Sequence, residues 1–516
     1  MNDFMSALKK SADAAVPNVS VTENGAVGYK TTGKKLVDLN FMLSSLRNMS
    51  DVEIWSHFIA AYNENPQLAL VWLFFARDIR EGCGERRTFR SIFNRFCYEN
   101  DEVALKLLKF VPFYGRWDDL TNVFFSEVPC NIRDEAFKII SKQLSDDLDN
   151  ARLRENISLL AKWLPSANTS SKETRRNAEM LRNFLGWTPK QYRKTLSRLR
   201  AYIGVVEQQM SANKWDRIDY ENVPSRASMN YRDAFHRHDP IGYESYLSNV
   251  KDGSAKIHSG TLFPYDIVHA YGRHGMPDMT LEEQWKALPN KVPDNESTLV
   301  VVDGSGSMMS SVGGTGVTCM DVARSIGIYF AEKLKGPYYN SFITFSANPH
   351  YVNFADGLSL RSKLSIMDSY SDCTNTNIEK VFDLVLDTAV KNRLKQSDLP
   401  SNILIISDME FDQATCADGY YWVERPKKTV SRRLFDTLSA RFTAHGYRMP
   451  RLVFWNVCSR TGTIPLTEND LGVTLVSGFS PNIADMVMSS ELDPYKCLLA
   501  KLSGERYQRV WNALKE

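Results

Sequence analysis

Apolar residues repeat in two different patterns along the chain. From about residue 36 to 285 they recur every three or four positions between short polar turns, as in amphipathic helices. One helix is expected to begin after the capping-box pair Ser50 and Glu53. The run LALVWLFFA at 68–76 is apolar on every side, which indicates a central helix. The pattern predicts an α-helical, HEAT-like repeat domain over residues 36–290, although no strict sequence repeat is visible.

The second half contains short β-branched apolar runs that end at acidic residues. TLVVVDGSGSM at 298–308 and SNILIISDMEF at 401–411 each resemble a buried strand that delivers an aspartate at its carboxyl end. The segment TNTNIEKVFDLVLDTAV at 374–390 indicates a polar loop that enters a helix. These elements predict an α/β domain with a doubly wound, Rossmann-like sheet over residues 296–516. Residues 1–35 are then an N-terminal extension.

Oxygen-bearing side chains follow the first of these strands at every second position. Asp303, Ser305 and Ser307 can point the same way in an extended loop, and the glycines between them allow close approach of the backbone. A carboxylate and two hydroxyls are hard ligands, which suit Mg²⁺ or Mn²⁺ better than Zn²⁺. The sequence therefore predicts a divalent-cation site after this strand.

Three other interpretations of the loop compete with a cation site. A phosphate-binding Walker loop needs Lys followed by Ser or Thr, but Met308 and Met309 occupy that region. A nucleophile elbow needs glycine two residues on either side of its serine, and neither Ser305 nor Ser307 has that spacing. A plain Gly/Ser turn, with Asp408 of the second strand run capping a helix, is the remaining alternative.

Taken together, these segments resemble a von Willebrand factor A domain. Asp303, Ser305 and Ser307 match its DxSxS metal motif, Thr376 its second-loop threonine and Asp408 its third-loop aspartate. Thr374 is the alternative for the threonine. The resemblance implies that these oxygens hold one Mg²⁺ or Mn²⁺ ion and leave a position open for an oxygen of a partner. The interpretation fails if Asp303 and Asp408 lie at opposite ends of the sheet.

Composition is that of an ordinary globular protein, with 43% hydrophobic and 24% charged residues. The N-terminal segment lacks the apolar core of a signal peptide, and no run approaches a membrane span, so we expect a cytoplasmic protein without membrane contact. The eight cysteines form no CxxC pair, which argues against structural zinc and a disulfide framework. His236 and His238 form an HxH that could ligate a metal, but no cysteine or second histidine pair lies near them in the sequence, so a satisfied surface or core role is expected for them.

The 63 basic and 61 acidic residues nearly balance, but their distribution is uneven. Between Lys172 and Arg200 there are nine basic and two acidic residues, and a helix beginning at Thr188 and Pro189 would display several of them. Such a surface suits the phosphate backbone of RNA. A solvated surface balanced by acidic residues near Asp147 is the alternative. The candidate RNA-binding residues are Arg175, Arg176, Lys190, Arg193, Lys194, Arg198 and Arg200.

The helical half carries a further resemblance. The segments FFARDIREGCGERRTF at 74–89, YGRWDDL at 114–120 and KIHSGTLFPYDIVHAY at 256–271 are similar to an uncharacterised family, found in phages and large viruses, that pairs a helical region with this metal domain. That architecture resembles the TROVE family of the Ro autoantigen. In that family, helical repeats close into a ring that binds single-stranded and structured RNA. The resemblance implies a ribonucleoprotein component, in the host cytoplasm if the protein is viral.

Two roles are considered for the charged residues in these segments. The dense group that includes Arg77, Asp78, Arg86 and Arg87 is expected to form ion pairs between helices, and gripping phosphates is the alternative. Arg116 is likewise expected to form ion pairs, with phosphate binding as the alternative. Trp117 is expected to anchor the core rather than to stack on a base.

Three functions follow from these patterns. The leading hypothesis is a non-enzymatic RNA-binding protein with a cation site. The alternative is an adhesion or scaffold module in which a carboxylate of a protein partner completes the coordination of the cation. The third is a metal-dependent hydrolase, which would need a general base near the metal. The sequence shows no such base at a recognisable spacing, and nothing in it singles out His350 or Glu410 for that role.

Overall fold

The chain forms two compact units, each made of two separate stretches of sequence. Residues 1–48 with 290–501 form the sheet unit, and residues 49–289 with 502–516 form the helical unit. The sequence predicts continuous domains, 36–290 and 296–516. In the structure, residues 36–48 instead belong to the sheet unit and residues 502–516 to the helical unit. The computed structural model describes residues 18, 20–21, 27–272, 276–293, 297–345, 349–370, 378–410, 430–462, 464, 473–488, 491 and 493–515.

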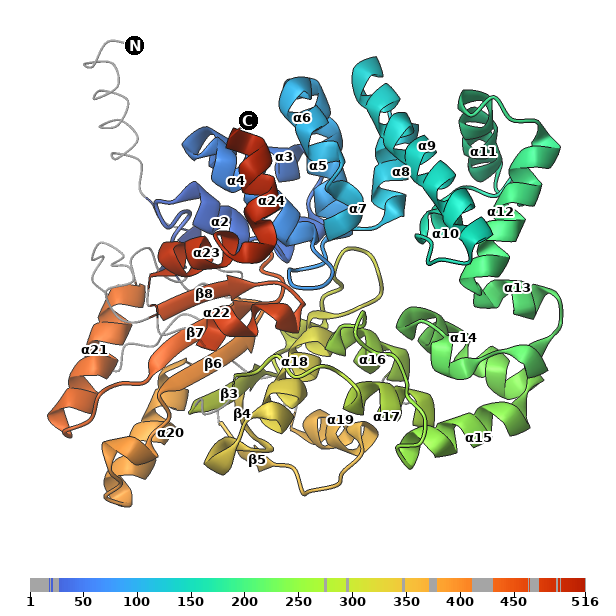
Figure 1. Ribbon diagram of the computed structural model, residues 1–516. Helices are drawn as coiled ribbons and strands as arrows, with labels where there is room; N and C mark the ends of the chain where they lie inside the picture. Colours follow the sequence, from blue (N-terminus) through green and yellow to red (C-terminus); the bar gives the residue numbers. More distant parts are fainter. Residues whose placement is uncertain are drawn as a thin grey trace, which may run out of the picture. The chain divides into compact units, whose positions relative to one another are not determined.

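The sheet unit contains a mostly parallel sheet in the order β5-β4-β3-β6-β7-β8 (Figure 1). Only β5, at one edge, runs antiparallel to its neighbour. This confirms a helical N-terminal region followed by a mostly parallel sheet. The strands are β3 (Thr298–Asp303), β4 (Ser341–Phe345), β5 (Tyr351–Asn353), β6 (Asn402–Ser407), β7 (Arg451–Asn456) and β8 (Val473–Ser477), and a separate antiparallel pair is formed by β1 (Ser20–Val21) and β2 (Val27–Gly28).

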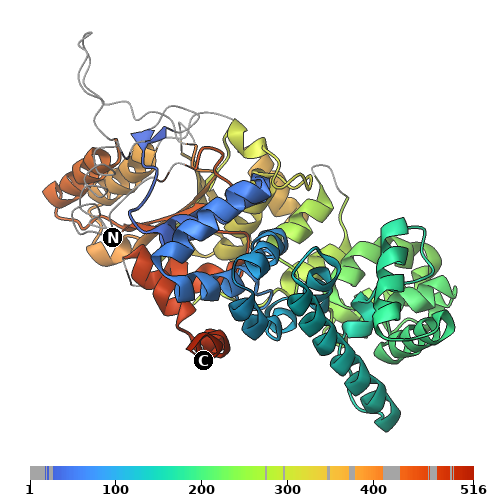
Figure 2. The ribbon, with the colours of Figure 1, turned by 90° about the horizontal axis from the view of Figure 1, so that it is seen from above.

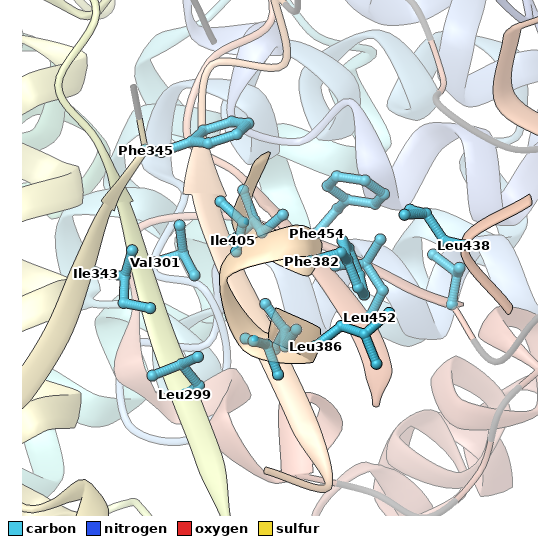
Figure 3. Close-up of a cluster of buried hydrophobic side chains, with 14 of the residues drawn as sticks. Leu299, Val301, Ile343, Phe345, Phe382, Leu386, Ile405, Leu438, Leu452 and Phe454 are labelled. Carbon is cyan, nitrogen blue, oxygen red and sulfur yellow. The ribbon is translucent and has the colours of Figure 1, made fainter. Parts of the chain in front are cut away.

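Helices cover both faces of this sheet because its strands are apolar on both sides. On one face α18 (Cys319–Lys333) packs so closely that a Cβ on Gly327 would lie 2.5 Å from Cγ2 of Val302. On the other face α20 (Ile378–Lys391) and α21 (Val430–Ala444) pack over a core that includes Val301, Phe382 and Leu438 (Figure 3). The helix predicted at 374–390 is therefore α20. The remaining helices of this unit are α2 (Lys35–Phe41), α19 (Leu360–Ser369), α22 (Ala484–Met488) and α23 (Pro494–Leu502).

Residues 36–48 belong to the sheet unit because they complete its core and its hydrogen bonding. Phe41 in α2 is fully buried, and its carbonyl accepts a bond of 2.9 Å from Nδ2 of Asn456 at the end of β7. Ser44 donates to the Asn456 carbonyl over 3.1 Å and lies 2.8 Å from the hydroxyl of Ser477 in β8. This segment therefore shields strand ends that would otherwise expose backbone polar groups.

The helical unit is a succession of helices (Figure 2), several of them separated by turns of one to four residues and others by longer connections such as 212–224 and 252–263. The capping box predicted at Ser50 is present, and the residues of α4 from Leu68 to Arg77 are all buried, as the apolar run predicts. The helices are α3 (Asp51–Glu64), α4 (Pro66–Arg77), α5 (Arg86–Glu99), α6 (Asp101–Leu108), α7 (Val111–Tyr114), α8 (Trp117–Phe125), α9 (Cys130–Leu153), α10 (Leu160–Trp163), α11 (Lys172–Phe184), α12 (Pro189–Ile203), α13 (Val206–Ser211), α14 (Ser225–His238), α15 (Pro240–Lys251), α16 (Pro264–Tyr271), α17 (Met279–Lys286) and α24 (Gln508–Lys515).

The end of the chain returns to this unit through a buried carboxylate. Asp78, directly after α4, is fully buried and accepts a bond of 2.7 Å from Nη2 of Arg506. The hydroxyl of Tyr507 donates to the same carboxylate over 3.2 Å, and its ring stacks on Tyr114. These contacts explain why residues 502–516 pack with helices more than 350 positions away in sequence.

Candidate functional site

The loop after β3 brings three oxygen-bearing side chains together. Asp303 ends the strand and is fully buried, and its Oδ1 accepts a bond of 2.9 Å from the backbone N–H of Ser305. The Ser305 and Ser307 hydroxyls lie 2.9 Å apart. Ser307 is carried by a short 3-10 helix, Gly306–Met309, that begins directly after Ser305. The alternating spacing in the sequence therefore places these groups side by side.

Asp408 lies at the same edge of the sheet as Asp303. It directly follows β6, the parallel neighbour of β3, and it is buried. Ser407 connects the two strand ends, because its hydroxyl donates to Oδ2 of Asp303 over 2.6 Å. The strand order reverses between β3 and β6, since β4 lies on the far side of β3. Ligands of open α/β sheets bind at the carboxyl ends of strands beside such a reversal.

Asp408 is a buried acid with a raised pKa, and one of its carboxylate oxygens has no hydrogen-bond donor among the described residues. Burial, and then the charge of Asp303, raise the pKa of Asp408 to about 7, while the Glu410 amide and the Ser307 hydroxyl act in the opposite direction. Oδ1 of Asp408 accepts from the Glu410 amide over 3.2 Å. Oδ2 is buried and accepts no hydrogen bond from the part of the chain that the structure describes, and Nη2 of Arg460 lies 3.8 Å from it.

The predicted threonine ligand cannot be placed in this site. Both Thr376 and its alternative Thr374 lie outside the described residues. The structure describes the chain again from Ile378, where α20 begins.

Glu410 positions a neighbouring loop. It is buried, and its Oε1 accepts from the backbone N–H groups of Arg460 and Thr461 over 2.9 and 3.1 Å and from the Thr461 hydroxyl over 3.1 Å. This bonding joins the loop after β7 to the end of β6 and brings Arg460 close to Asp408.

The sequence analysis did not identify Ser407 and Arg460 as parts of this site. Ser407 could have been identified, because it is a polar residue directly before the aspartate, whereas nothing in the sequence around Arg460 indicates its position.

Histidines and cysteines form no conventional metal cluster in the described residues, where no group of three or more His, Cys, Asp or Glu side chains is arranged to hold an ion. The candidate site at the strand ends differs from such a cluster because it combines two aspartates with two serine hydroxyls. His238 instead stacks on Trp215 at 4.3 Å between ring centroids, and the ring of His236 meets Tyr243 edge-on. The pair therefore packs in the helical unit, as expected from the sequence.

A second candidate site, the basic surface, is formed by exposed cationic residues of α11 and α12. The helix predicted at Thr188 begins there with a capping box to Gln191 and buries Tyr192 and Leu196. None of the exposed cations forms an ion pair with a described residue, and Arg175 donates to the carbonyl of Thr169 over 2.6 Å. The members of the basic surface are Arg175, Arg176, Lys190, Arg193, Lys194 and Arg198.

Arg200 is not part of the basic surface, although the sequence analysis included it. Its guanidinium donates to the carbonyls of Ala161 and Leu164 over 2.9 and 2.7 Å and to the Ser166 hydroxyl over 2.8 Å. The spacing explains this placement, because Arg200 follows Leu196 by four residues and so shares its buried face. Arg200 joins α12 to α10.

The acidic stretch near the basic surface is engaged elsewhere. Asp147 is fully buried and accepts from the backbone N–H and hydroxyl of Ser158 over 2.9 and 2.7 Å. Asp149 pairs with Arg152 on its own helix at 2.7 Å. The alternative that these aspartates balance the basic surface therefore loses two of its acidic residues.

The arginines near the start of the helical unit mainly form ion pairs, as expected. Arg77 is buried and donates to Oδ2 of Asp119 through Nε and Nη2, over 2.9 and 2.6 Å. Arg87 pairs with the exposed Asp51 at 3.0 Å. These bonds connect α4 to α8 and α5 to α3.

The fold and site thus define a protein that combines a helical region with an α/β unit whose strand ends gather acidic and hydroxyl side chains. The chain is 31% identical to the "Uncharacterized protein L728" of Acanthamoeba polyphaga mimivirus over 518 residues, which cover 93% of this chain and 87% of the viral protein. It belongs to the family of that viral protein.

Two family models match parts of the chain. Residues 297–500 match a domain of unknown function, DUF7788, and residues 170–298 match another, DUF2828. The first match nearly coincides with the main stretch of the sheet unit. Within the described residues, no helix is long and apolar enough to cross a membrane.

Proposed function

We propose that the sheet unit is a von Willebrand factor A-type domain that holds Mg²⁺ or Mn²⁺. Asp303, Ser305, Ser307 and Asp408 would provide oxygens, with Thr376, or Thr374 in its place, as a further ligand. The observation that carries this proposal is Oδ2 of Asp408, a buried carboxylate oxygen that accepts no hydrogen bond from the described residues and lies beside a second buried carboxylate. A hard divalent cation would neutralise both carboxylates and satisfy that oxygen.

The role proposed for this site is binding rather than catalysis. A hydrolase would need a general base within reach of a metal-bound water. Glu410 is occupied by the loop after β7, and His350 is exposed beside the edge strand β5. Neither residue has the surroundings of a poised base, so we propose a non-enzymatic protein.

We further propose that the helical unit binds single-stranded or structured RNA, as in a TROVE-like ribonucleoprotein built on HEAT-like helices. The basic surface supports this proposal because its six cations are exposed and unneutralised by described acidic residues. Guanidinium and ammonium groups free of ion pairs are available for backbone phosphates. A succession of helices is also what a helical repeat scaffold requires.

Replacing three cations of the basic surface tests RNA binding. We expect Arg193→Gln/Lys194→Gln/Arg198→Gln to weaken the binding of a fluorescent RNA by about tenfold or more and to reduce the slope of log affinity against log salt by roughly two to three, because each phosphate contact releases a counterion. Fluorescence anisotropy over a range of salt concentrations measures both quantities.

The matched control removes the same charge from elsewhere in the helical unit. Lys138, Lys142 and Lys251 are exposed residues of α9 and α15, so Lys138→Gln/Lys142→Gln/Lys251→Gln should change affinity far less. If both triple variants lose the same RNA affinity, only the net charge of the protein matters. If the Arg193/Lys194/Arg198 variant binds RNA as the parent does, the basic surface does not contact RNA.

A protein-adhesion module is the second candidate. One observation favours it: Gly306 is exposed, and no atom of the described residues, apart from its chain neighbours and the backbone of its own short helix, lies within 4 Å of where its Cβ would be, so these residues leave the cation loop open on that side. A carboxylate of a protein partner could approach there. Partner binding that a chelator abolishes, by a protein that binds no RNA, would favour this candidate over the first.

A further inference from the structure

The helical unit contains a second group of cationic residues, separate from α11 and α12 in sequence, in which positive charge exceeds negative charge. Among the described residues, the carboxylates that interact with Arg77, Arg86, Arg90 and Arg116 are those of Asp118 and Asp119. The four guanidinium groups therefore leave an excess of two positive charges. They come from the end of α4, from α5 and from the residue before α8.

Asp119 is fully engaged within this group. It accepts two bonds from Arg77, one of 2.8 Å from Nε of Arg90 and one of 2.9 Å from the backbone N–H of Arg116. Asp118 is shared, with Arg90 at 3.0 Å and Arg86 at 3.5 Å from its Oδ2. Arg77 is thus satisfied by Asp119. Arg90 donates through Nε to Asp119, but its buried Nη2, although 3.0 Å from Oδ2 of Asp118, makes no hydrogen bond with a described residue, and Arg86 makes one long contact.

Arg116 has donors to spare. Its guanidinium lies over the ring of Trp163 in α10, 5.4 Å from the ring centroid, and donates no hydrogen bond to any residue that the structure describes. Partial burial lowers the pKa of Arg116, and the charge of Arg86 lowers it further, which Asp118 only partly offsets. Two incompletely paired guanidinium groups in partial shelter from solvent favour an anion, and a planar guanidinium matches the oxygens of phosphate.

We propose that Arg86 and Arg116, supported by Arg90, bind a phosphate group of an RNA strand. Arg86 and Arg116 would donate to the phosphate oxygens, and Trp163 would hold the guanidinium of Arg116 in place. Arg77 and Asp119 serve as the buried support of the site. The identity of the ligand as RNA rests on the proposed function, whereas the affinity for phosphate rests on the charge excess alone.

The test compares Arg116→Gln with Arg87→Gln, which removes the same charge from the same region. Arg87 is half-exposed and pairs with the exposed Asp51, so its replacement should leave the site intact. By anisotropy with a short fluorescent oligouridylate, we expect Arg116→Gln to weaken binding by about tenfold and to reduce the salt slope by about one, with less than about a twofold change for Arg87→Gln. Equal affinities of the two variants would overturn the proposal.

Two further measurements separate the possible failures. Thermal melting checks that Arg116→Gln folds, and if it does not, Arg86→Gln replaces it, because Arg86 is half-exposed and makes only the long contact to Asp118. If the parent binds no RNA but is stabilised by inorganic phosphate, and Arg116→Gln loses that stabilisation, the phosphate site stands and the RNA function falls. If neither RNA nor phosphate distinguishes parent from variant, the site itself is refuted.

Discussion

At the scale of single residues, Asp408 shows how a binding site differs from a stable core. A buried carboxylate normally has donors for both oxygens, since an unpaired charge in a poorly solvated place is costly. Asp408 has Asp303 as a neighbour, and its Oδ2 has no donor among the described residues. Because its pKa rises from 3.8 to about 7 on folding, its ionisation costs stability increasingly between these two pH values, and the full cost persists above pH 7 in the absence of a cation. Such a cost is typical of a site shaped for a ligand.

The first residue-scale prediction concerns this carboxylate. In the presence of a chelator at pH 8, we expect Asp408→Asn to raise the melting temperature by a few degrees, about what 1 kcal/mol produces, because it removes a charge that the folded state disfavours. At pH 5 the gain should shrink, since Asp408 is already protonated in the folded parent below its pKa of about 7. Differential scanning calorimetry at the two pH values measures the difference.

The same variant must lose the response to a cation. Mg²⁺ should raise the melting temperature of the parent, by about 2.7 kcal/mol of stabilisation when its concentration is a hundred times the Kd, and should leave both Asp408→Asn and Asp303→Ala almost unchanged. Identical shifts in parent and variants would contradict the metal assignment.

At the scale of elements, α12 illustrates how local sequence and packing combine. Thr188 accepts a bond from the Gln191 amide over 3.3 Å, the Gln191 side chain accepts one from the Thr188 amide over 2.8 Å, and Pro189 occupies the first turn. These groups satisfy amides that have no partner within the helix. Tyr192 and Leu196 then fix which face is buried, so the basic residues between them are displayed.

We therefore predict that Thr188→Ala destabilises the helical unit. Loss of an N-cap hydroxyl typically costs about 1 kcal/mol, and urea denaturation should detect it as a lower midpoint without a change in slope. Thr188→Ser, which retains the hydroxyl, is the matched control and should remain within a few tenths of a kcal/mol of the parent. An unaffected Thr188→Ala protein would mean that packing alone holds the start of α12.

At the scale of the whole molecule, each unit is completed by a segment from one end of the chain. The sheet unit takes α2 from the N-terminal region, and the helical unit takes α24 from the C-terminus. Asp78 is the clearest reason for the second exchange, because its buried charge is balanced by Arg506. Removing one partner of a buried pair leaves an uncompensated charge, which typically costs about 3–5 kcal/mol.

We predict that deleting residues 502–516 loosens the helical unit selectively. In hydrogen-exchange mass spectrometry, the amides of α4 should lose protection because Asp78, Phe75 and Tyr114 lose their contacts with Arg506 and Tyr507. The strands β3 and β6 should keep their protection, which serves as the internal control. Unchanged exchange in α4 would show that the C-terminal segment is dispensable for this unit.

The sequence by itself determined the elements and the local chemistry. Periodicity and propensity act over a few residues, and they account for the capping boxes at Ser50 and Thr188, the apolar run of α4 and the strands that lead to Asp303 and Asp408. The proximity of Asp303, Ser305 and Ser307 could be predicted for the same reason, because they alternate along one short loop. Thr376 remains a prediction, since it lies outside the described residues.

Only the tertiary structure decided which distant residues meet. The placement of Arg460 beside Asp408, the anchoring of Arg200 on α10 and the pairing of Asp78 with Arg506 depend on packing between elements far apart in sequence. The strand order that puts Asp303 next to Ser407 is likewise a property of the assembled sheet. The physical reason is that hydrophobic burial has no direction: it drives the elements together, and the fit of side chains then selects their neighbours.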